Sequence, residues 1–266
     1  MVIPVIGTLP CDNDENEIAT GERAVIALAR ANIYNLLASA YAEPPSARLI
    51  RAVADGTLLR AFRDVGLDHV AAQLERHILG RSDVDLMEEM KVEYTRLFVA
   101  PGPSYVAPYQ SMYCVELDNG STSTQNDGKT LDKRQLWGNC AVAAQRMYSE
   151  AGLAVSGEQR DAPDHIGLEL QFMHHLCSRE AEALNAGRIP NAEESVRLQA
   201  AFLETQLLPW AEKFCQAVGN EARHPFYKGI ASLTNAFVLS DAEELLQPTR
   251  PSGAVAKSRD SDQCLA

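Results

Sequence analysis

Apolar residues recur every three or four positions along most of this chain, and prolines or glycines interrupt each run. The first run is stopped by the pair Pro44-Pro45. Its predicted apolar face consists of Val25, Leu28, Asn32 or Ile33, Leu36, Leu37 and Tyr41. This spacing is typical of amphipathic helices, whereas the two-residue alternation of half-buried strands is nearly absent. We therefore predict an all-α fold, a single globular, bundle-like domain of about eight to ten helices.

The same pattern sets the expected boundaries of the domain. Residues 1–19 contain Pro4, Pro10 and a cluster of acids and amides without periodicity, which predicts a flexible leader. The helical domain is expected over residues 20–248. The polar, unpatterned segment 249–266 is predicted to be a disordered tail.

Glycines, prolines and capping residues predict where individual helices begin and end. Gly152 and Gly187 each follow an apolar run, a position at which glycine terminates helices. Pro209 predicts a kink in the turn that precedes it. Asp161 fits an N-cap, with Asp164 as an acidic partner in the first turn that follows.

Charge and hydropathy exclude several classes of protein. The 266 residues include 36 acids against 24 lysines and arginines, a formal charge of -12. Nucleic-acid binders neutralise phosphates with Lys and Arg, so this balance argues against a nucleic-acid partner. The sequence has no apolar stretch of membrane-spanning length and no basic, apolar secretory start, so we predict a cytoplasmic protein without stable membrane insertion.

The cysteines and the missing catalytic motifs give no sign of an active site. The six cysteines, at positions 11, 114, 140, 177, 215 and 264, include no close pair in sequence. They are predicted to be reduced, mostly buried thiols rather than disulfides or zinc ligands. The signatures GxSxG, GxxxxGK[ST], GxGxxG and HExxH are absent from the sequence. We accordingly predict no catalytic residues, no metal and no bound cofactor.

Two segments are unusually dense in aromatic, proline and charged residues. The first, residues 93–113, reads EYTRLFVAPGPSYVAPYQSMY, and the second, residues 163–173, reads PDHIGLELQFM. Together they resemble the TorD/DmsD family of maturation chaperones for molybdenum enzymes, whose pattern is E-Y-x-x-L-F, P-x-x-x-x-P-Y-x-S-x-Y and P-D-H-x-x-x-E-L-x-F-M. A third segment, FLETQLLPWAEKF at 202–214, is similar to the family's FLxxHLxxW, but Gln206 stands where the family has histidine.

The resemblance implies an all-helical chaperone rather than an enzyme. Members of the family bind the twin-arginine signal peptide and the apo form of a molybdenum-cofactor oxidoreductase related to DMSO reductase. They assist cofactor insertion and assembly in the cytoplasm before export. The expected partner is therefore the catalytic subunit of such an oxidoreductase, together with its basic leader, whereas the identity of that client stays open.

The residues expected to bind the leader come from the matching motifs. An apolar wall is expected from Tyr94, Leu97 and Phe98, and a rigid rim from Pro108, Tyr109 and Ser111. Polar contacts for the arginines are expected from Asp164 and His165, with Glu169 one turn further on the same helix. Pro163, which precedes them, is included in the expected site.

Each group of residues also has a purely structural interpretation. The wall residues sit at core spacing, Asp164 could only complement a helix dipole, and His165 could only pair with Glu169 four residues on.

Two rival functions stay open at this point. The first is a metal- or nucleotide-dependent hydrolase that uses His165, Glu169 and His174. The second is a permanent structural subunit of the oxidoreductase.

Overall fold

The computed structural model describes residues 12–114, 138–153 and 162–246. The all-α prediction is confirmed, because this part of the chain contains ten α-helices and no strand beyond an isolated bridge between Tyr109 and His165. The α-helices are α1 Asp12–Ala42, α2 Ala47–Ala54, α3 Thr57–Asp64, α4 Asp68–Ile78, α5 Asp83–Tyr94, α6 Asn139–Glu150, α7 Ile166–Asn185, α8 Ile189–Phe202, α9 Ala211–Glu221 and α10 Pro225–Leu246. Three short segments join them: the π-helical η1 Thr95–Val99 and η3 Leu203–Leu207, and the 3-10 turn η2 Gln110–Met112.

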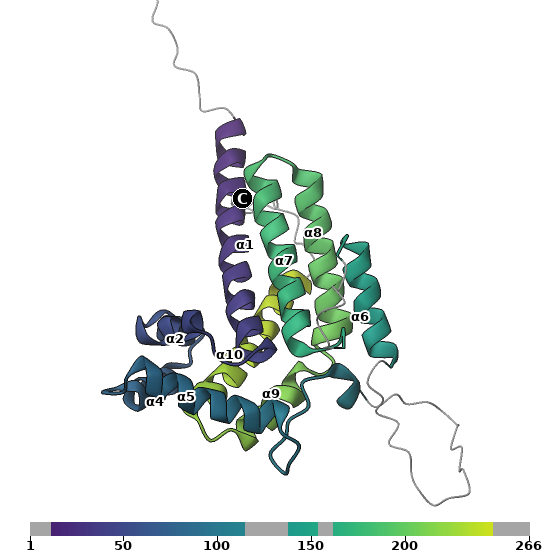
Figure 1. Ribbon diagram of the computed structural model, residues 1–266. Coiled ribbons are helices and arrows are strands. Elements are labelled where there is room, and N and C mark those ends of the chain that lie inside the picture. Colours follow the sequence, from purple (N-terminus) through teal and green to yellow (C-terminus); the bar gives the residue numbers. More distant parts are fainter. Residues whose placement is uncertain (1–11, 115–137, 154–161, 247–266) are drawn as a thin grey trace, which may run out of the picture.

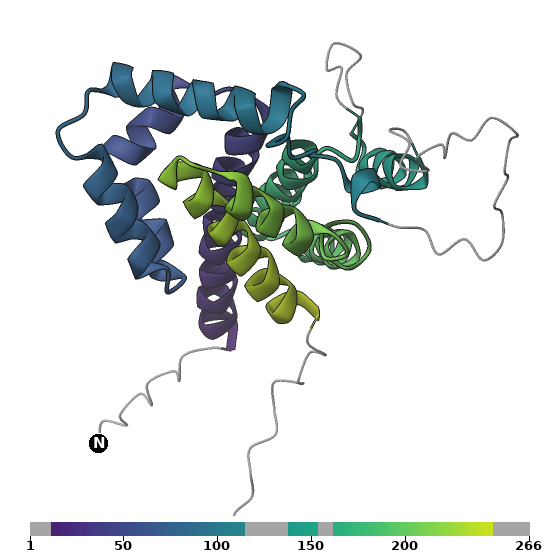
Figure 2. The same cartoon turned by 90° about the horizontal axis from the view of Figure 1, so that it is seen from below.

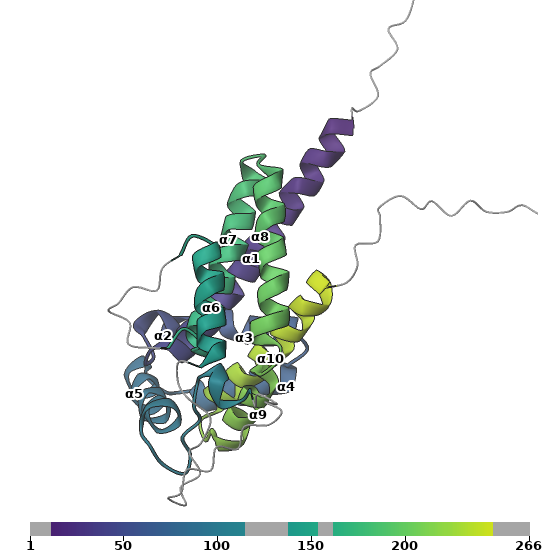
Figure 3. The same ribbon diagram turned by 90° about the vertical axis from the view of Figure 1, so that its right-hand side faces the viewer.

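The helices are arranged as an upright row with a second group at one end. α1 packs most extensively against α7, α7 also packs against α8, and α6 flanks this row (Figure 1). α2 to α5 and α9 gather at the end where α1 finishes, as the view from below shows (Figure 2). α10 contacts α4, α8 and α9 and leaves the row at an angle (Figure 3). One core of buried apolar side chains joins the two groups. No helix in the described ranges is both long enough and apolar enough to cross a membrane.

The N-terminal half of α1 places small residues inward and large aliphatic residues outward. Ala24, Ala27 and Ala31 are at most 3% exposed. Val25 and Leu28, which were predicted to be buried, are 70% and 52% exposed. The prediction was wrong at these two positions because the distance between packed helices depends on the side chains at the contact, and alanines allow the closest approach.

The two ends of α1 test the predicted boundaries differently. The helix ends at Ala42, directly before the segment that contains Pro44 and Pro45, as predicted. It begins at Asp12, eight positions before the expected start at residue 20. The acid-rich stretch that looked like loop is compatible with a helix start, because negative charge is favourable at a helix N-terminus. The rest of the predicted leader, residues 1–11, and the predicted tail at 249–266 lie outside the described residues.

The residues predicted to end or interrupt helices act largely as expected. Gly152 and Gly187 follow α6 and α7 with φ angles of 80° and 67°, a conformation that glycine adopts without strain. The kink expected at Pro209 is present as a longer interruption, because η3 separates α8 from α9. Gly167, in the first turn of α7, is required for packing, since a Cβ there would lie 2.8 Å from the Cβ of Ala42 at the end of α1.

A buried polar cluster, here called the arginine network, links the four helices α1, α7, α8 and α10 through hydrogen bonds. It consists of Arg30 on α1, Tyr34 on α1, Glu180 on α7, Gln199 on α8 and Asp241 on α10. The Arg30 guanidinium donates to Asp241, to Glu180 Oε2 at 3.3 Å and to Gln199 Oε1 at 2.6 Å. The Tyr34 hydroxyl donates to Asp241 Oδ2 at 2.6 Å, and Gln199 Nε2 donates to Glu180 Oε2 at 2.9 Å. Within the described residues, every side chain of this network has a hydrogen-bond partner.

Candidate functional site

The structure brings the first two motif segments into direct backbone contact. Pro108 O accepts a hydrogen bond from Ile166 N at 2.9 Å, and Gln110 N donates to Asp164 O at 2.9 Å. These bonds flank the isolated bridge between Tyr109 and His165. The segment after the proline-rich loop is therefore joined to the turn that starts α7, at the lower end of that helix in Figure 1.

Asp164 is fully buried and holds the loop through its side chain. Its Oδ2 accepts a hydrogen bond from Ser111 N at 2.9 Å. The residue precedes α7, which begins at Ile166, so it does not occupy the first helical turn in which the sequence placed it. The expected N-cap, Asp161, lies outside the described residues, and His165 caps the helix instead.

His165 performs that capping through its imidazole ring. Gly167 N donates to His165 Nδ1 at 3.0 Å, which supplies an acceptor for one of the first N–H groups of α7. The same ring meets Tyr109 edge to face, with centroids 5.2 Å apart. His165 is 4% exposed, and Tyr109 is half-buried, so the pair forms the inner edge of the loop.

The third motif segment closes the same junction from η3. The Trp210 Nε1–H donates to Glu169 Oε2 at 3.1 Å, and Gln110 Nε2 donates to the backbone oxygen of Gln206 at 3.0 Å. Burial raises the pKa of the Glu169 carboxyl well above its usual range, and Asp164 raises it further, whereas the Trp210 hydrogen bond opposes the rise. Glu169 is therefore held in a setting that favours its neutral form.

Buried polar atoms without a partner concentrate at this junction. Among the described residues, seven buried side-chain nitrogen or oxygen atoms have no hydrogen-bond partner, and five of them belong here. These five are Gln110 Oε1, Ser111 Oγ, Asp164 Oδ1, Glu169 Oε1 and Gln206 Oε1. We call these five residues the acceptor cluster. All five atoms are oxygens; the Ser111 hydroxyl and a neutral Glu169 carboxyl can also donate, but the other three oxygens can only accept, so acceptors outnumber donors among the unpaired atoms. Unpaired buried polar groups are rare and costly, which makes such a concentration a candidate functional site.

The predicted apolar wall lies behind this cluster, inside the core. Tyr94 and Phe98 are each 6% exposed and Leu97 is 0% exposed. The Tyr94 hydroxyl donates to the backbone oxygen of Tyr41 at 3.1 Å, and Phe98 packs edge to face against Tyr41 with centroids 5.8 Å apart. Pro108 and Pro163 are buried as well. In this conformation these side chains support the junction from within and offer little surface to a partner.

The charged residues of the first motif have a structural task that the sequence did not reveal. Glu93 Oε1 accepts from the backbone N–H groups of Arg223 and, at 3.0 Å, His224, just before α10. Arg96 binds Glu93 bidentately, with both nitrogen–oxygen distances 2.8 Å. Although burial acts in the opposite direction, these hydrogen bonds lower the pKa of Glu93 to about 2. The pair therefore fixes η1 to the corner between α9 and α10.

One group of residues among those described brings three metal-ligand atoms within 4.8 Å of one another: His77, Glu89 and His224. Glu89 Oε2 lies 3.2 Å from His77 Nε2 and 3.8 Å from His224 Nε2. However, His224 Nδ1 accepts a hydrogen bond from Phe226 N at 3.1 Å, so the neutral ring carries its proton on Nε2. A ligating histidine instead donates from its second nitrogen, so the geometry does not fit a metal ligand.

The residues of the proposed hydrolase do not form a comparable group. His165 Nδ1 is engaged at the start of α7, Glu169 accepts from Trp210, and His174 Nδ1 lies 2.9 Å from the backbone oxygen of Ala31. They are absent from the three-ligand groupings of the described residues. The described structure therefore gives this rival function no assembled site.

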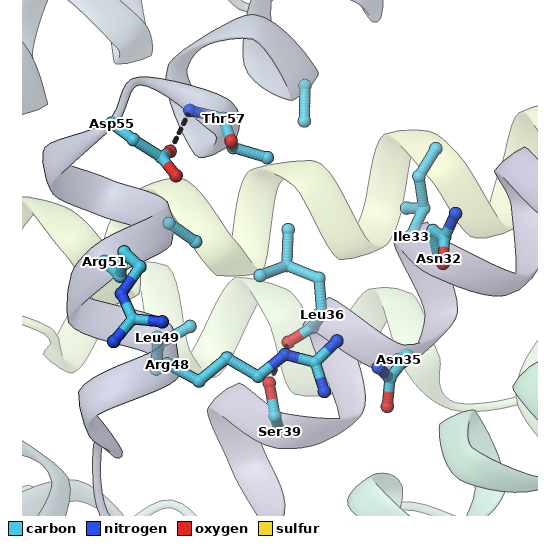
Figure 4. Close-up of a pocket in the computed structure, with 12 residues that line it drawn as sticks. Asn32, Ile33, Asn35, Leu36, Ser39, Arg48, Leu49, Arg51, Asp55 and Thr57 are labelled. Atoms are coloured by element: carbon cyan, nitrogen blue, oxygen red, sulfur yellow. Dashed lines mark hydrogen bonds between the residues drawn. The ribbon is translucent and has the colours of Figure 1, made fainter.

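A surface pocket of about 420 Å³ lies between α1, α2 and α3, away from the motif segments. Ile33, Leu36 and Leu49 form its apolar part, while the guanidinium groups of Arg48 and Arg51 lie at its edge (Figure 4). Asp55 accepts from Thr57 N at 2.9 Å on the far side. The pocket contains none of the predicted site residues.

Comparisons with known proteins agree with the motif segments. A family model described as nitrate reductase delta subunit matches residues 63–216, more than half of the chain. Chaperone protein TorD of Shewanella amazonensis is 27% identical over 242 residues, covering 86% of this chain and 96% of that protein. TorD of Colwellia psychrerythraea is 23% identical, covering 82% and 92%. The perchlorate reductase assembly chaperone protein of Dechloromonas aromatica is 30% identical over 100 residues, 38% of this chain and 44% of that protein. The chain therefore belongs to the nitrate reductase delta subunit family, which includes the TorD/DmsD maturation chaperones.

Proposed function

We propose that this protein is a cytoplasmic, non-enzymatic chaperone for a molybdenum-cofactor oxidoreductase. In this role it binds the twin-arginine leader and the apo form of the catalytic subunit, and it assists cofactor insertion before export. The names of its relatives support a chaperone that acts on a redox enzyme. The acceptor cluster supports the finer proposal that the partner presents arginine.

The observation that carries this proposal is the match between unpaired acceptors and a guanidinium group. An arginine offers five N–H donors in a planar fork and no acceptor. The junction offers five buried oxygens without partners, two of them from the carboxyl groups of Asp164 and Glu169. Hydrogen bonds from a charged donor to such oxygens are each worth about 1.5–3 kcal/mol. A leader arginine would supply the donors that the described residues lack at this place.

Access to the cluster requires the proline-rich loop to move. Tyr105 in that loop is 38% exposed, whereas Pro108 is buried against the start of α7. The loop follows the π-helical segment η1, and η3 borders the cluster on the other side. π-helical turns are frequent at functional sites because they interrupt the regular hydrogen-bond ladder. We assign the opening motion to the loop between η1 and η2.

The predicted binding residues divide into two roles under this proposal. Asp164, Glu169 and Ser111 contact the leader arginine, and Tyr109 forms the rim of the opening. The buried side chains of the two motifs position these groups from behind. This second set comprises Tyr94, Leu97, Phe98, Pro108, Pro163 and His165.

The experiment is titration of the purified protein with a twin-arginine leader peptide. Binding is followed through tryptophan fluorescence, to which Trp210 contributes through its contact with Glu169. Replacing the two peptide arginines with citrulline keeps their shape and removes their charge, and is expected to weaken binding at least tenfold. Asp164→Asn is expected to weaken binding to a similar degree. Glu150→Gln, on the exposed end of α6, is the matched control and should bind as the unmodified chain does.

Equal affinity for the arginine and citrulline peptides would show that the acceptor cluster does not bind a charged leader arginine. Absence of binding to any leader, and to the apo client, would refute the proposed function as a whole.

A further inference from the structure

One side of α1 is apolar and uncovered. Ile18, Val25 and Leu28 are 63%, 70% and 52% exposed, and Ala29 is exposed beside them. These four residues, called here the α1 stripe, are spaced so that they share one side of the helix. α1 packs most extensively against α7, and Figure 1 shows no other described helix along the far side of its upper half. A contiguous exposed apolar face of this kind is typical of an interaction surface.

The α1 stripe leads into the pocket of about 420 Å³ between α1, α2 and α3. Asn32 follows Leu28 by one helical turn, Leu36 follows one turn later, and both line the pocket. The guanidinium groups of Arg48 and Arg51 lie at its edge (Figure 4). Both arginines are exposed, and among the described residues neither forms an ion pair. The stripe and the pocket therefore form one surface that is apolar along α1 and basic at the end near α2.

The other end of α1 has the opposite charge. Residues 12–17, the first six of the helix, include four acids and no lysine or arginine. Arg48 and Arg51 belong to α2, at the end where α1 finishes. An acidic start, an apolar middle and a basic end thus follow one another along this face. A second α1 running in the opposite direction matches each of these parts, because its acidic start lies beside the basic end and its stripe lies against the stripe.

A twofold axis near Val25 satisfies both ends at once. Antiparallel helices rise equally on either side of such an axis, so residues 32–36 of one copy lie opposite residues 14–18 of the other. The contact is isologous, because each copy contributes the same patch, and it closes as a dimer. The net charge of -12 on each chain opposes association in general, so the apolar stripe and the local charge pairing must outweigh that repulsion.

We propose that two copies of this chain form an antiparallel dimer through the α1 stripe, with the acidic start of each α1 at the Arg48 and Arg51 edge of the pocket in the other copy. The occupant of this surface is a second copy of the protein. The pocket contains no residue of the acceptor cluster, so the inference does not rest on the proposed function.

The test is sedimentation equilibrium of the purified full-length chain over a range of concentrations, with two substitutions at the axis. The unmodified protein is expected to dimerise reversibly. Val25→Glu and Val25→Lys each place like charges opposite one another and remove an apolar contact, so each should weaken dimerisation about 100-fold. Mixed in equal amounts, the two variants should associate again as a heterodimer, because residue 25 faces its counterpart across the axis. Val142→Glu, at a 60% exposed valine on α6, is the matched control and should dimerise as the unmodified chain does.

A second set of variants tests the charged ends. Arg48→Glu combined with Arg51→Glu should weaken dimerisation about tenfold. Replacing the four acids of residues 12–17 by their amides should cause a loss of similar size. Because the two groups act on each other, both sets together should cost no more than the arginine changes alone.

Two results would overturn the proposal. The first is a chain that stays monomeric at every concentration, or a dimer that Val25→Glu leaves intact. The second is a mixture of Val25→Glu and Val25→Lys that fails to associate although circular dichroism shows both variants folded, because the contact then has no twofold axis near Val25. Association in the mixture, in contrast, shows at the same time that both variants are folded and that the two copies meet at this residue.

Discussion

The arginine network and the acceptor cluster are both buried and polar, yet they differ in how their hydrogen bonds are satisfied. In the first, Arg30 brings donors to Asp241 and Glu180, and within the described residues each side chain has a partner. In the second, five buried side-chain oxygens of the described residues have no hydrogen-bond partner. Among the described residues, an arginine is thus present in the first cluster and no arginine contacts the unpaired oxygens of the second.

This difference separates a structural role from a binding role. Buried polar groups that are fully paired fix one arrangement of the helices that carry them. Buried acceptors without donors lower the stability of the free protein and become favourable only when a donor arrives. The missing group has the chemistry of the guanidinium that Arg30 supplies elsewhere. The following predictions test whether the two regions differ in this way.

The largest expected effect is the loss of Arg30. Arg30→Met leaves two buried carboxylates without their counter-charge, which should lower the free energy of unfolding by about 3–5 kcal/mol. Urea denaturation measures the change. Arg197→Met, which breaks an exposed pair with Glu194 on α8, is the control and should leave the denaturation midpoint unchanged. A small effect at Arg30 would show that the network does not hold the helices together.

The stability contributed by the buried imidazole of His224 should change with pH in the opposite sense from that contributed by the buried carboxyl of Glu169. Burial, with the neighbouring His77 acting in the same direction, lowers the pKa of His224 to about 4. The associated stability is complete above pH 6.5 and is lost as the pH falls from 6.5 towards 4, by up to about 3 kcal/mol. His224→Asn keeps an acceptor for Phe226 N but cannot titrate. The free energy of unfolding of this variant, measured by urea denaturation at several pH values, should not fall between pH 6.5 and 4 for this reason. If the variant and the unmodified protein lose stability in parallel as the pH falls, His224 is not the group responsible.

Glu169 should show the opposite sign. Because the pKa of this buried carboxyl is raised, its contribution to stability is complete below pH 4.5 and is lost as the pH rises towards the folded-state value. Glu169→Gln removes that loss and adds N–H donors among unpaired oxygens. The variant should therefore be more stable by about 1 kcal/mol near neutral pH. A destabilised variant would indicate that the cluster is already satisfied in the free protein.

The smallest expected effect is at Gln206, where the family pattern has histidine. The hydrogen bond from Gln110 reaches the backbone oxygen of Gln206, not its side chain. Gln206→His should therefore change the free energy of unfolding by no more than about 0.5 kcal/mol. Urea denaturation of Gln110→Leu gives the comparison, because this change removes the bond itself and should cost more. A large loss in Gln206→His would assign the side chain a packing role.

The sequence was sufficient to predict the fold class because helical periodicity and helix-ending prolines and glycines are properties of short stretches of chain. Helical spacing, Pro44-Pro45, Gly152 and Gly187 predicted elements that the structure contains. The inward face of α1 was predicted wrongly at Val25 and Leu28, since which face is buried depends on the shape of the neighbouring helix and not on the sequence of α1 alone.

The candidate site was predictable only in part. The motifs gave Asp164 and Glu169, but hydrogen-bond pairing is a three-dimensional property. The unpaired oxygens of Gln110 and Gln206 have no signal in the linear pattern. The task of Glu93, which accepts from N–H groups 130 and 131 positions away, was hidden for the same reason.

The most direct test of the account is calorimetric titration of the twin-arginine leader peptide in two buffers with different ionisation enthalpies. If a leader arginine enters the acceptor cluster, the neutral carboxyl of Glu169 ionises beside it, because an adjacent positive charge lowers the pKa of a buried acid. The account predicts net proton release on binding to the unmodified protein and none on binding to Glu169→Gln. Binding with identical heats in both buffers, and equal affinity for the two proteins, would contradict it.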